Sequence, residues 1–419
     1  MHDRPPSRHR VSAFALSLIV AVALAAPAVA GNADVRFATF NASLNRSFEG
    51  QLIADLSTPA NAQAATVAEI VQWTRPEVLL VNEFDFDADG EALRLFQENY
   101  LSVPHNGAAP IEYPYRFTAP SNTGIPSGFD LDNNGSVGGP NDAFGFGFFP
   151  GQFGMAVYSQ HPILESQIRT FQTFLWKDMP GALLPDDPRT AAPADWYSEE
   201  ELDVFRLSSK SHWDVPVSVD GCVVHFLVSH PTPPVFDDPP AFPAGVDFNG
   251  RRNFDEIRFW ADYISPGARS FYIYDDEGHR GGLKPGSMFV IAGDQNSDPL
   301  DGDSIPGSAQ LLLEHPLVNT KLTPSSEGAV EASLIQGGAN ATHEGDPAFD
   351  TADFADSAPG NLRADYVLPR KSLRMQDAAV FWPPQADPLF RLTGVFPFPS
   401  SDHRLVWVDA SVPGTARGR

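Results

Sequence analysis

The chain has 419 residues, 42% of them hydrophobic, so it is long enough to bury a substantial core. Its formal net charge of −25 at pH 7 excludes a broad basic surface and argues against tight binding to long polyanions. A small basic or metal-filled site can still attract one phosphate group, because screening acts over ~8 Å at physiological salt. The single cysteine, Cys222, has no partner in the chain, which excludes an intrachain disulfide.

The first thirty residues have the pattern of a signal peptide. Arg4, Arg8 and Arg10 precede an apolar run over residues 11–26, and small residues follow at Ala28 and Ala30. We therefore predict a signal peptide over residues 1–30 and a secreted or periplasmic protein. A retained N-terminal anchor is the alternative, although the run is shorter than the ~20 residues that a bilayer requires.

Eight later segments have the composition of β-strands, and two have helical patterns. Some strands are continuously apolar and others alternate, which favours two sheets packed face to face with helices outside. One helix precedes Pro76, and the other has Asn253 and Glu256 as a capping pair at its start. The predicted strands are 35–43, 77–84, 153–159, 207–219, 222–230, 288–296, 363–369 and 404–410, and the helices are 61–73 and 254–264.

Proline and glycine gather in three stretches, near residues 102–151, 179–197 and 231–250. Strand patterns and polar motifs resume after each one, so we interpret them as surface insertions. Length alone would permit two or three domains. We predict a single domain over residues 31–412 with these insertions, followed by a flexible tail over residues 413–419.

Polar side chains stand where the predicted strands end. Asp294 and Asn296 are two residues apart and should point to the same side of their strand. Oxygen ligands of this kind suit Mg²⁺, Mn²⁺ or Ca²⁺ better than zinc. A single strand that ends in polar residues would be weak evidence for a metal site, because Asp and Asn often begin turns. The same feature recurs at several strand ends, with Asn41, Glu83, His230, Asp294, Asn296, Asp402 and His403.

In this order, the motifs resemble the endonuclease/exonuclease/phosphatase superfamily of metal-dependent phosphoesterases. The resemblance rests on Asn41, on Glu83 after an apolar strand, and on the segments "GMAVYSQHPI", "GDQN", "ADYVL" and "SDHRLV". It covers nearly the whole chain after residue 30. The fold that it implies is an α+β four-layer sandwich, with two packed mixed β-sheets flanked by helices.

The resemblance also implies a role for each residue. Glu83 would hold Mg²⁺ or Mn²⁺, with Asn41 and Asp402 beside it, and Asp294 and Asn296 would orient the attacking water and a phosphate oxygen. His403 would contact the phosphate and be held by Asp365, and His230 would protonate the leaving oxygen. The alternatives are a core or loop histidine at 230 and a solvated acidic turn at 83. Many relatives carry an acidic residue where this chain has Ser43, so a second metal on that strand is not expected.

Four basic residues are candidates for holding the substrate phosphate. Lys210 and His212 should share one strand face, and Arg251 and Arg252 stand just before the second predicted helix, whose N-terminus would attract anions. The alternative is that the arginines are surface charges that offset an acidic chain.

A second metal pattern lies outside the family motifs. The segment "DLDNNGSVGGPND" resembles a calcium loop, although the usual glutamate at its twelfth position is absent. Its candidate ligands for a structural Ca²⁺ are Asp130, Asp132, Asn134 and Asp142. A turn rich in Asp and Asn is the alternative.

The sequence thus predicts a secreted, divalent-metal-dependent phosphoesterase acting on a phosphodiester or phosphomonoester. Its substrate would be a phosphorylated small molecule, a phospholipid headgroup or nucleic acid, with a small or lipid-like substrate favoured by the acidic chain and the aromatic insertion "AFGFGFFPGQFGM". We expect a monomer without an obligate protein partner. A secreted nuclease is the first alternative, and a non-catalytic binding protein on the same fold is the second.

Overall fold

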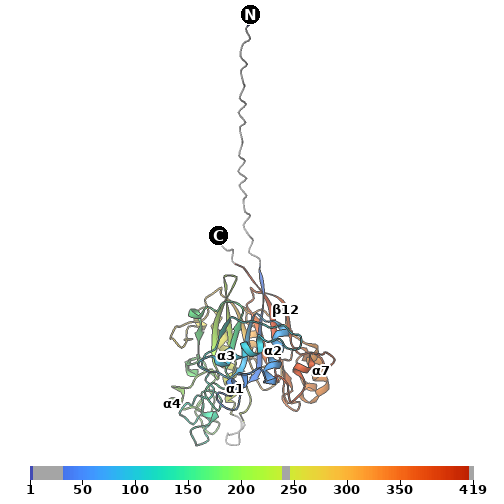
Figure 1. Cartoon of the computed structure of the whole chain (residues 1–419). Coiled ribbons are helices and arrows are strands. Elements are labelled where there is room, and N and C mark those ends of the chain that lie inside the picture. Colours follow the sequence, from blue (N-terminus) through green and yellow to red (C-terminus); the bar gives the residue numbers. More distant parts are fainter. Residues whose placement is uncertain (3–31, 238–245, 415–419) are drawn as a thin grey trace.

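The computed structural model describes residues 1–2, 32–237 and 246–414, so nearly all of the predicted signal peptide and most of the predicted tail lie outside it. The described residues form the predicted α+β sandwich, with helices on the outer faces of two packed sheets (Figure 1). None of the helices in these ranges is long and apolar enough to span a membrane.

Both large sheets are mixed, as predicted. In the first sheet β1 and β2 are parallel, in the second β7 and β8 are parallel, and the other neighbours are antiparallel. The first sheet has the order β12 (Arg374–Val380), β13 (Val406–Val412), β1 (Ala33–Leu44), β2 (Val78–Phe84), β4 (Met155–Ser159) and β3 (Tyr115–Phe117). The second has the order β11 (Asp365–Pro369), β8 (Met288–Asp294), β7 (Cys222–Ser229), β6 (His212–Val219) and β5 (Arg169–Thr170). A separate small pair contains β9 (Ala352–Asp353) and β10 (Asn361–Leu362).

The helices divide between the two outer faces and the connections. The α-helices are α1 (Gln51–Leu56), α2 (Ala62–Thr74), α3 (Glu91–Phe96), α4 (Glu199–Leu202), α5 (Phe248–Tyr263), α6 (Gln310–Leu313), α7 (Glu327–Gln336) and α8 (Phe390–Thr393). A π-helical turn, η1 (Gln97–Leu101), extends α3. Short 3-10 turns are η2 (Pro140–Asp142), η3 (Glu165–Gln167), η4 (Trp176–Asp178), η5 (Gly267–Arg269), η6 (Gly338–Thr342) and η7 (Pro347–Phe349).

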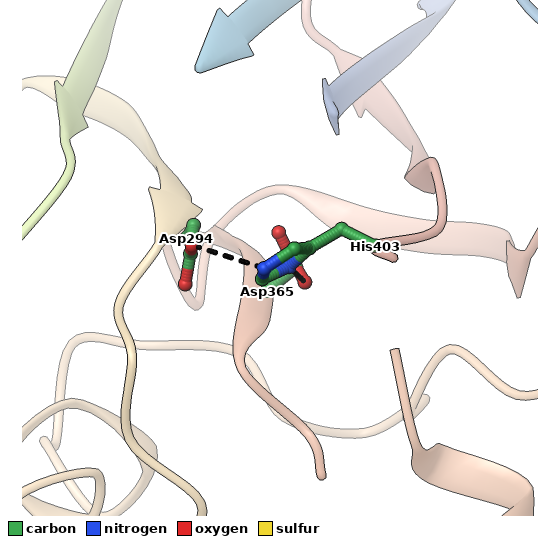
Figure 2. Close-up of side chains that lie close together, drawn as sticks. All are labelled: Asp294, Asp365 and His403. Atoms are coloured by element: carbon green, nitrogen blue, oxygen red, sulfur yellow. Dashed lines mark hydrogen bonds and ion pairs between the residues drawn. The ribbon is translucent and has the colours of Figure 1, made fainter. Parts of the chain in front are cut away.

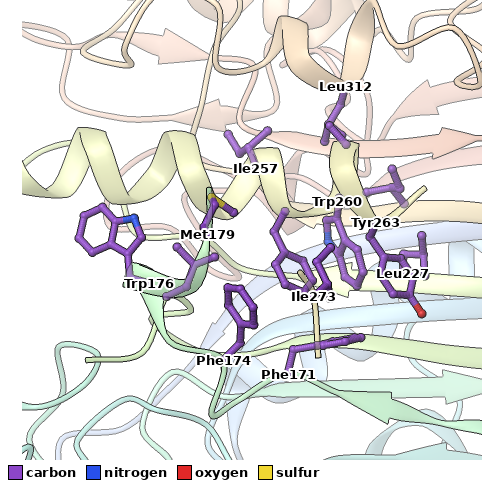
Figure 3. Packing of buried hydrophobic residues seen from close by; sticks show 14 of the residues in the cluster. Phe171, Phe174, Trp176, Met179, Leu227, Ile257, Trp260, Tyr263, Ile273 and Leu312 are labelled. Atoms are coloured by element: carbon purple, nitrogen blue, oxygen red, sulfur yellow. The ribbon is translucent and has the colours of Figure 1, made fainter. Parts of the chain in front are cut away.

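Three buried clusters hold the layers together. Between the sheets, inward side chains of both meet, and the rings of Phe37 on β1 and Phe226 on β7 lie 5.9 Å apart. Outside the first sheet, α2 and α3 pack on β1 and β2. Outside the second, α5 covers β7 and β8, and Figure 3 shows Ile257 and Trp260 of α5 among buried aromatic and aliphatic side chains.

The first predicted helix is confirmed within one residue. The side chain of Asn61 accepts a hydrogen bond from the Ala64 N–H, which begins α2, and Arg75 ends it in the left-handed region (φ 56°) just before Pro76. The prediction for α5 was wrong at its start. This helix begins at Phe248, six residues earlier than 254, and its N-cap is Asp247, which accepts a hydrogen bond from the Gly250 N–H.

Candidate active site

The topology explains why distant polar residues meet at one edge of the sandwich. Parallel strands end at the same edge of a sheet, so the ends of β1 and β2 lie together, as do those of β7 and β8. The antiparallel strands β11 and β13 begin at that edge, and Asp365 at the start of β11 pairs directly with Asp294 at the end of β8. One pocket there is lined by Glu83, His230, Asp294, Asn296, Asp402 and His403, together with Lys210.

His403 lies between two buried carboxylates (Figure 2). Its Nδ1 is 2.8 Å from Oδ2 of Asp365 and its Nε2 is 3.6 Å from Oδ2 of Asp294. Burial alone would lower the pKa of His403, but the charges of Asp365 and Asp294 outweigh it and raise that pKa well above its ordinary value. The three side chains offer ligand atoms within 4.8 Å of one another. The raised pKa and the bond to Asp365 favour a protonated His403 at neutral pH, and a protonated ring has no free nitrogen lone pair to offer a metal ion.

Asp294 is the shared acceptor of the site. Its Oδ2 accepts a hydrogen bond from the Asn41 amide at 3.0 Å and lies 3.4 Å from Nε2 of His230. Burial alone would raise the pKa of the Asp294 carboxyl, but the charge of His403 and the hydrogen bond from His230 outweigh it and lower that pKa. Asp294 is therefore a carboxylate at neutral pH.

Asp294 and Asn296 line one pocket, but not for the reason that the sequence suggested. The strand β8 ends at Asp294, and Asn296 adopts a left-handed conformation (φ 51°), so alternation along a strand does not apply. The Asn296 N–H donates to Oδ1 of Asp294, and its side-chain amide donates to the Pro231 carbonyl, next to His230. A tight turn therefore brings the two residues together.

Gly293 allows the strands carrying these groups to approach closely. Its φ is 150°, and a Cβ atom at this position would lie 2.1 Å from the main-chain oxygen of Ser229 on β7. No side chain fits there. The close approach keeps His230 and Asp294, each the next residue along its strand, within contact distance.

Glu83 and Asp402 both line the pocket, and their predicted role as ligands of a divalent cation stays a prediction. Burial raises the pKa of the Glu83 carboxyl, and the charge of Asp402 acts in the same direction. Oε2 of Glu83 accepts a hydrogen bond from Asn45 at 2.7 Å, and Oδ1 of Asp402 accepts one from Ser43 at 3.3 Å. Two mutually repelling carboxylates with oxygen-bearing neighbours fit a hard cation such as Mg²⁺. Glu83 also has a left-handed backbone (φ 57°), and such conformations cluster at functional sites.

Asn41 connects the two carboxylates on either side of it. Its side-chain nitrogen donates to Oε1 of Glu83 at 3.1 Å and to Asp294, while its oxygen accepts from the Ser43 N–H. The structure thus shows Asn41 as a bridge between Glu83 and Asp294. Its role as a metal ligand stays a prediction.

His230 and Lys210 face the same pocket with different protonation tendencies. Both are buried. Burial, with the charge of Lys210, lowers the pKa of His230 to about 4, so its imidazole is neutral at pH 7 before an anion binds. Burial also lowers the pKa of the Lys210 ammonium, against the opposing charges of Glu256 and Glu83.

The remaining three basic candidates do not present a free cation to the pocket. His212 is fully buried between Ser208 and the main-chain oxygen of Glu256, and burial lowers its pKa to about 3. The strand β6 begins at His212, so Lys210 precedes it and the expectation that the two share a strand face was wrong. Arg252 lines the pocket, but its guanidinium donates to the carbonyls of Leu207, Phe144 and Arg206. Arg251 is half-buried, donates to the Leu184 carbonyl and does not line the pocket. Since α5 starts at Phe248, both arginines lie within the helix and not before it.

The sequence did not reveal the residues that hold the loops at the pocket. Glu256 of α5 accepts hydrogen bonds from the N–H groups of Ser209 and Thr232, both at 2.6 Å. Asn253 donates to the carbonyls of Thr232 and Gln295. The two residues predicted to cap the helix therefore fasten the loops that carry Lys210, His230 and Asp294. Their helical positions were visible in the sequence, but nothing local indicates the partners.

The predicted calcium loop brings three of its four residues together. Asp130, Asp132 and Asp142 offer carboxylate oxygens within 4.8 Å of one another. Asn134 instead accepts a hydrogen bond from the Ser136 N–H, and its own N–H donates to Asp130 and Asp132. Main-chain N–H groups also bind Asp142. The geometry is that of an Asp- and Asn-rich turn, and calcium binding there stays a prediction.

Comparison with known proteins assigns the family. The model of the Endonuclease/Exonuclease/phosphatase family matches residues 38–403, and the chain belongs to this family. No curated protein matches the chain.

Several solved structures are similar to this chain at low identity. An endonuclease/exonuclease/phosphatase from Beutenbergia cavernae DSM 12333 is 16% identical, with a TM-score of 0.47, over 90% of this chain and 72% of that one. Beta toxin from Staphylococcus aureus, solved with bound magnesium ions, is 13% identical, with a TM-score of 0.42, over 90% and 99%. Sphingomyelinase C from Streptomyces griseocarneus is 14% identical, with a TM-score of 0.40, over 90% and 99%.

Proposed function

We propose that the protein is a secreted, metal-dependent phosphoesterase that hydrolyses a phosphodiester or phosphomonoester by attack of water on phosphorus. The observation that carries the proposal is His403 between Asp365 and Asp294, in one pocket with Glu83, Asp402, His230 and Lys210. Family membership supports hydrolytic chemistry. We expect the protein to act as a monomer.

Glu83 and Asp402, with Asn41 beside them, would hold Mg²⁺ or Mn²⁺. When bound, the cation supplies positive charge to the phosphate oxygens. Residues of the chain would bind the phosphate, orient the attacking water and protonate the leaving oxygen. Cationic His403 and Lys210 would attract and orient the phosphate, since both lie in the pocket and His403 is held by Asp365.

Asp294 would orient the attacking water and accept its proton, because its lowered pKa keeps it ionised. Asn296 would bind a phosphate oxygen. As the water oxygen bonds to phosphorus, the ester P–O bond breaks and the leaving oxygen takes a proton from His230. His230 must first be protonated, and the bound phosphate anion would raise its pKa from the value in the free enzyme.

The test is hydrolysis of bis-p-nitrophenyl phosphate, p-nitrophenyl phosphate and plasmid DNA, with EDTA, Mg²⁺ or Mn²⁺. Asp294→Asn and His403→Ala should abolish turnover. His225→Ala is a matched control, because Nδ1 of His225 lies 2.7 Å from Oδ1 of Asp214 in a second His–Asp pair that does not line the pocket.

Three results are informative. Metal-dependent turnover lost in the two site variants and kept in His225→Ala supports the proposal. Turnover of DNA alone would favour the nuclease over a small or lipid-like substrate. If wild type and variants were equally inactive on these substrates and on natural phospholipids, the phosphoesterase proposal would fail. The non-catalytic binding protein would then replace it.

A further inference from the structure

The pocket is far larger than a phosphate group requires. Its volume is about 1140 Å³, beyond the range of roughly 300 to 1,000 Å³ that encloses most drug-sized ligands. The catalytic groups occupy only part of its lining. The rest of the pocket must therefore contact some other part of whatever molecule binds there.

Most of that remaining lining is apolar, and the three insertions supply a large part of it, with a further apolar part from residues 354–364. Ala143 and Phe146 belong to the first insertion, Tyr197 to the second, and Val235 and Phe248 to the third. We call these five residues the apolar wall. The insertions thus contribute to one side of the pocket. Another part, which we call the catalytic floor, consists of Glu83, Lys210, His230, Asp294, Asn296, Asp402 and His403.

Part of the apolar wall is exposed to water in the free protein. Phe146 is 50% exposed, and its neighbour Phe148, 69% exposed, stands edge-to-face against it with ring centroids 5.6 Å apart. Exposed aromatic side chains at the side of a catalytic pocket are stabilised when an apolar ligand covers them.

The charges near the apolar wall disfavour a second phosphate on the substrate. Asp132 and Asp303 line the same pocket and would repel further anionic groups. The Arg252 guanidinium donates to the main-chain carbonyls of Leu207, Phe144 and Arg206 and packs over the Phe205 ring at 4.7 Å. A polynucleotide, with a charge on every residue, fits this lining poorly.

We propose that the apolar wall binds a long alkyl or acyl ester group of a phosphodiester substrate, so that the substrate class is an amphiphilic phosphodiester. This inference rests on the proposed phosphoesterase function. A phospholipid or a soluble alkyl phosphodiester would offer the same chemistry to the wall.

The test is a series of monomeric p-nitrophenyl alkyl phosphates, from methyl to octyl, all below their critical micelle concentrations. We expect kcat/KM to rise by roughly two- to fourfold for each added methylene until the chain fills the wall, since each buried CH₂ contributes at most ~0.8 kcal/mol. Vesicles of phosphatidylcholine, assayed in parallel, distinguish a lipid from a soluble ester as the natural source.

Two variants locate the effect. Ala143→Trp should fill the apolar wall and remove the advantage of the octyl ester over the methyl ester. Phe146→Ser removes an exposed ring without opening the core and should reduce that advantage severalfold. Phe271→Ser is the matched control, because Phe271 is 71% exposed and lies outside the pocket lining.

The outcomes separate this inference from the function on which it rests. Equal kcat/KM along the series, with the methyl ester still hydrolysed, would overturn the apolar wall and leave the phosphoesterase standing. An octyl advantage that occurs only above the critical micelle concentration, or that persists in both wall variants, would also overturn it. Failure to hydrolyse any member of the series would count against both.

Discussion

The carboxylate of Glu256 binds the N–H of Thr232, two residues beyond His230, at 2.6 Å. Its other oxygen binds the N–H of Ser209, the neighbour of Lys210, at the same distance. One fully buried side chain on α5 therefore sets the positions of two loops that reach the phosphate site. Because Glu256 contacts no reacting atom, we regard it as a positioning residue.

Glu256→Gln should lower kcat by about tenfold or more and change KM little. The substituted amide puts an N–H group against one of the two N–H donors, and leaving a buried donor unpaired costs about 1–3 kcal/mol. Steady-state kinetics and urea denaturation measure both effects. Glu98→Gln, on an exposed part of η1, is the control. Wild-type kcat in a destabilised Glu256→Gln protein would show that the residue supports the fold alone.

Asp365→Asn should make activity sensitive to alkaline pH. In the wild type the charges of Asp365 and Asp294 overcome burial and hold the pKa of His403 well above its ordinary value, so the ring stays protonated through neutral pH. Removing one negative charge lowers that pKa, and activity should then fall as pH rises through it. Profiles of kcat/KM against pH would reveal the shift, with Asp214→Asn as the control. Identical profiles for Asp365→Asn and wild type would contradict a charged His403.

Mg²⁺ should raise the melting temperature of the wild type, and Glu83→Gln should abolish most of that rise. A ligand at about 100 times its Kd stabilises by ~2.7 kcal/mol. Without metal, Glu83→Gln should melt above the wild type, because burial and the charge of Asp402 disfavour the Glu83 carboxylate. Differential scanning fluorimetry in EDTA and in Mg²⁺ measures both. An undiminished Mg²⁺ shift in Glu83→Gln would place the metal elsewhere.

Asp350→Asn should stabilise the protein at high pH. Burial, together with the charges of Asp298 and Asp301, raises the pKa of the Asp350 carboxyl from 3.8 to about 8. The folded state therefore holds this proton more tightly than the unfolded state. The stability it contributes is complete below pH 3.8 and is lost as pH rises towards 8, by up to ~1.4 kcal/mol per pH unit. Urea denaturation from pH 5 to 9 should show the variant gaining on the wild type as pH rises, and the exposed Asp89→Asn should not. A constant difference across that range would refute the shift.

The strands were predictable because their apolar runs are long and end at turn residues. All eight predicted segments overlap a strand of the two large sheets. The strands that were not predicted are short or weakly patterned. For example, β12 lies at the edge of its sheet with much of its surface exposed, and only its pairing with β13 makes it a strand. The start of α5 was predicted six residues late because Asn253 and Glu256 have the residue types of a capping pair.

The sequence also predicted which residues would meet, since the topology brings the ends of parallel strands to one edge. It did not reveal what holds them. Thr351 donates to Asp365 at 2.8 Å, and Asn45 donates to Glu83. Contacts of this kind depend on how loops cross the end of the sandwich, which no local pattern records. His212 was predicted to bind the phosphate but is a fully buried core residue. A histidine two residues from a lysine is equally typical of a packed core, so the sequence could not separate the two cases.

The catalytic floor and the apolar wall have no residue in common. His230 is the last floor residue before the third insertion, and Ala143, Phe146 and Tyr197 are supplied by the other two. Exchanging an insertion for another of different length, with the anchoring contacts of Pro231 and Thr232 kept, would then alter which ester group the pocket accepts. Because separate segments carry the reacting groups and contact the ester group, substrate specificity can change while the reaction stays the same.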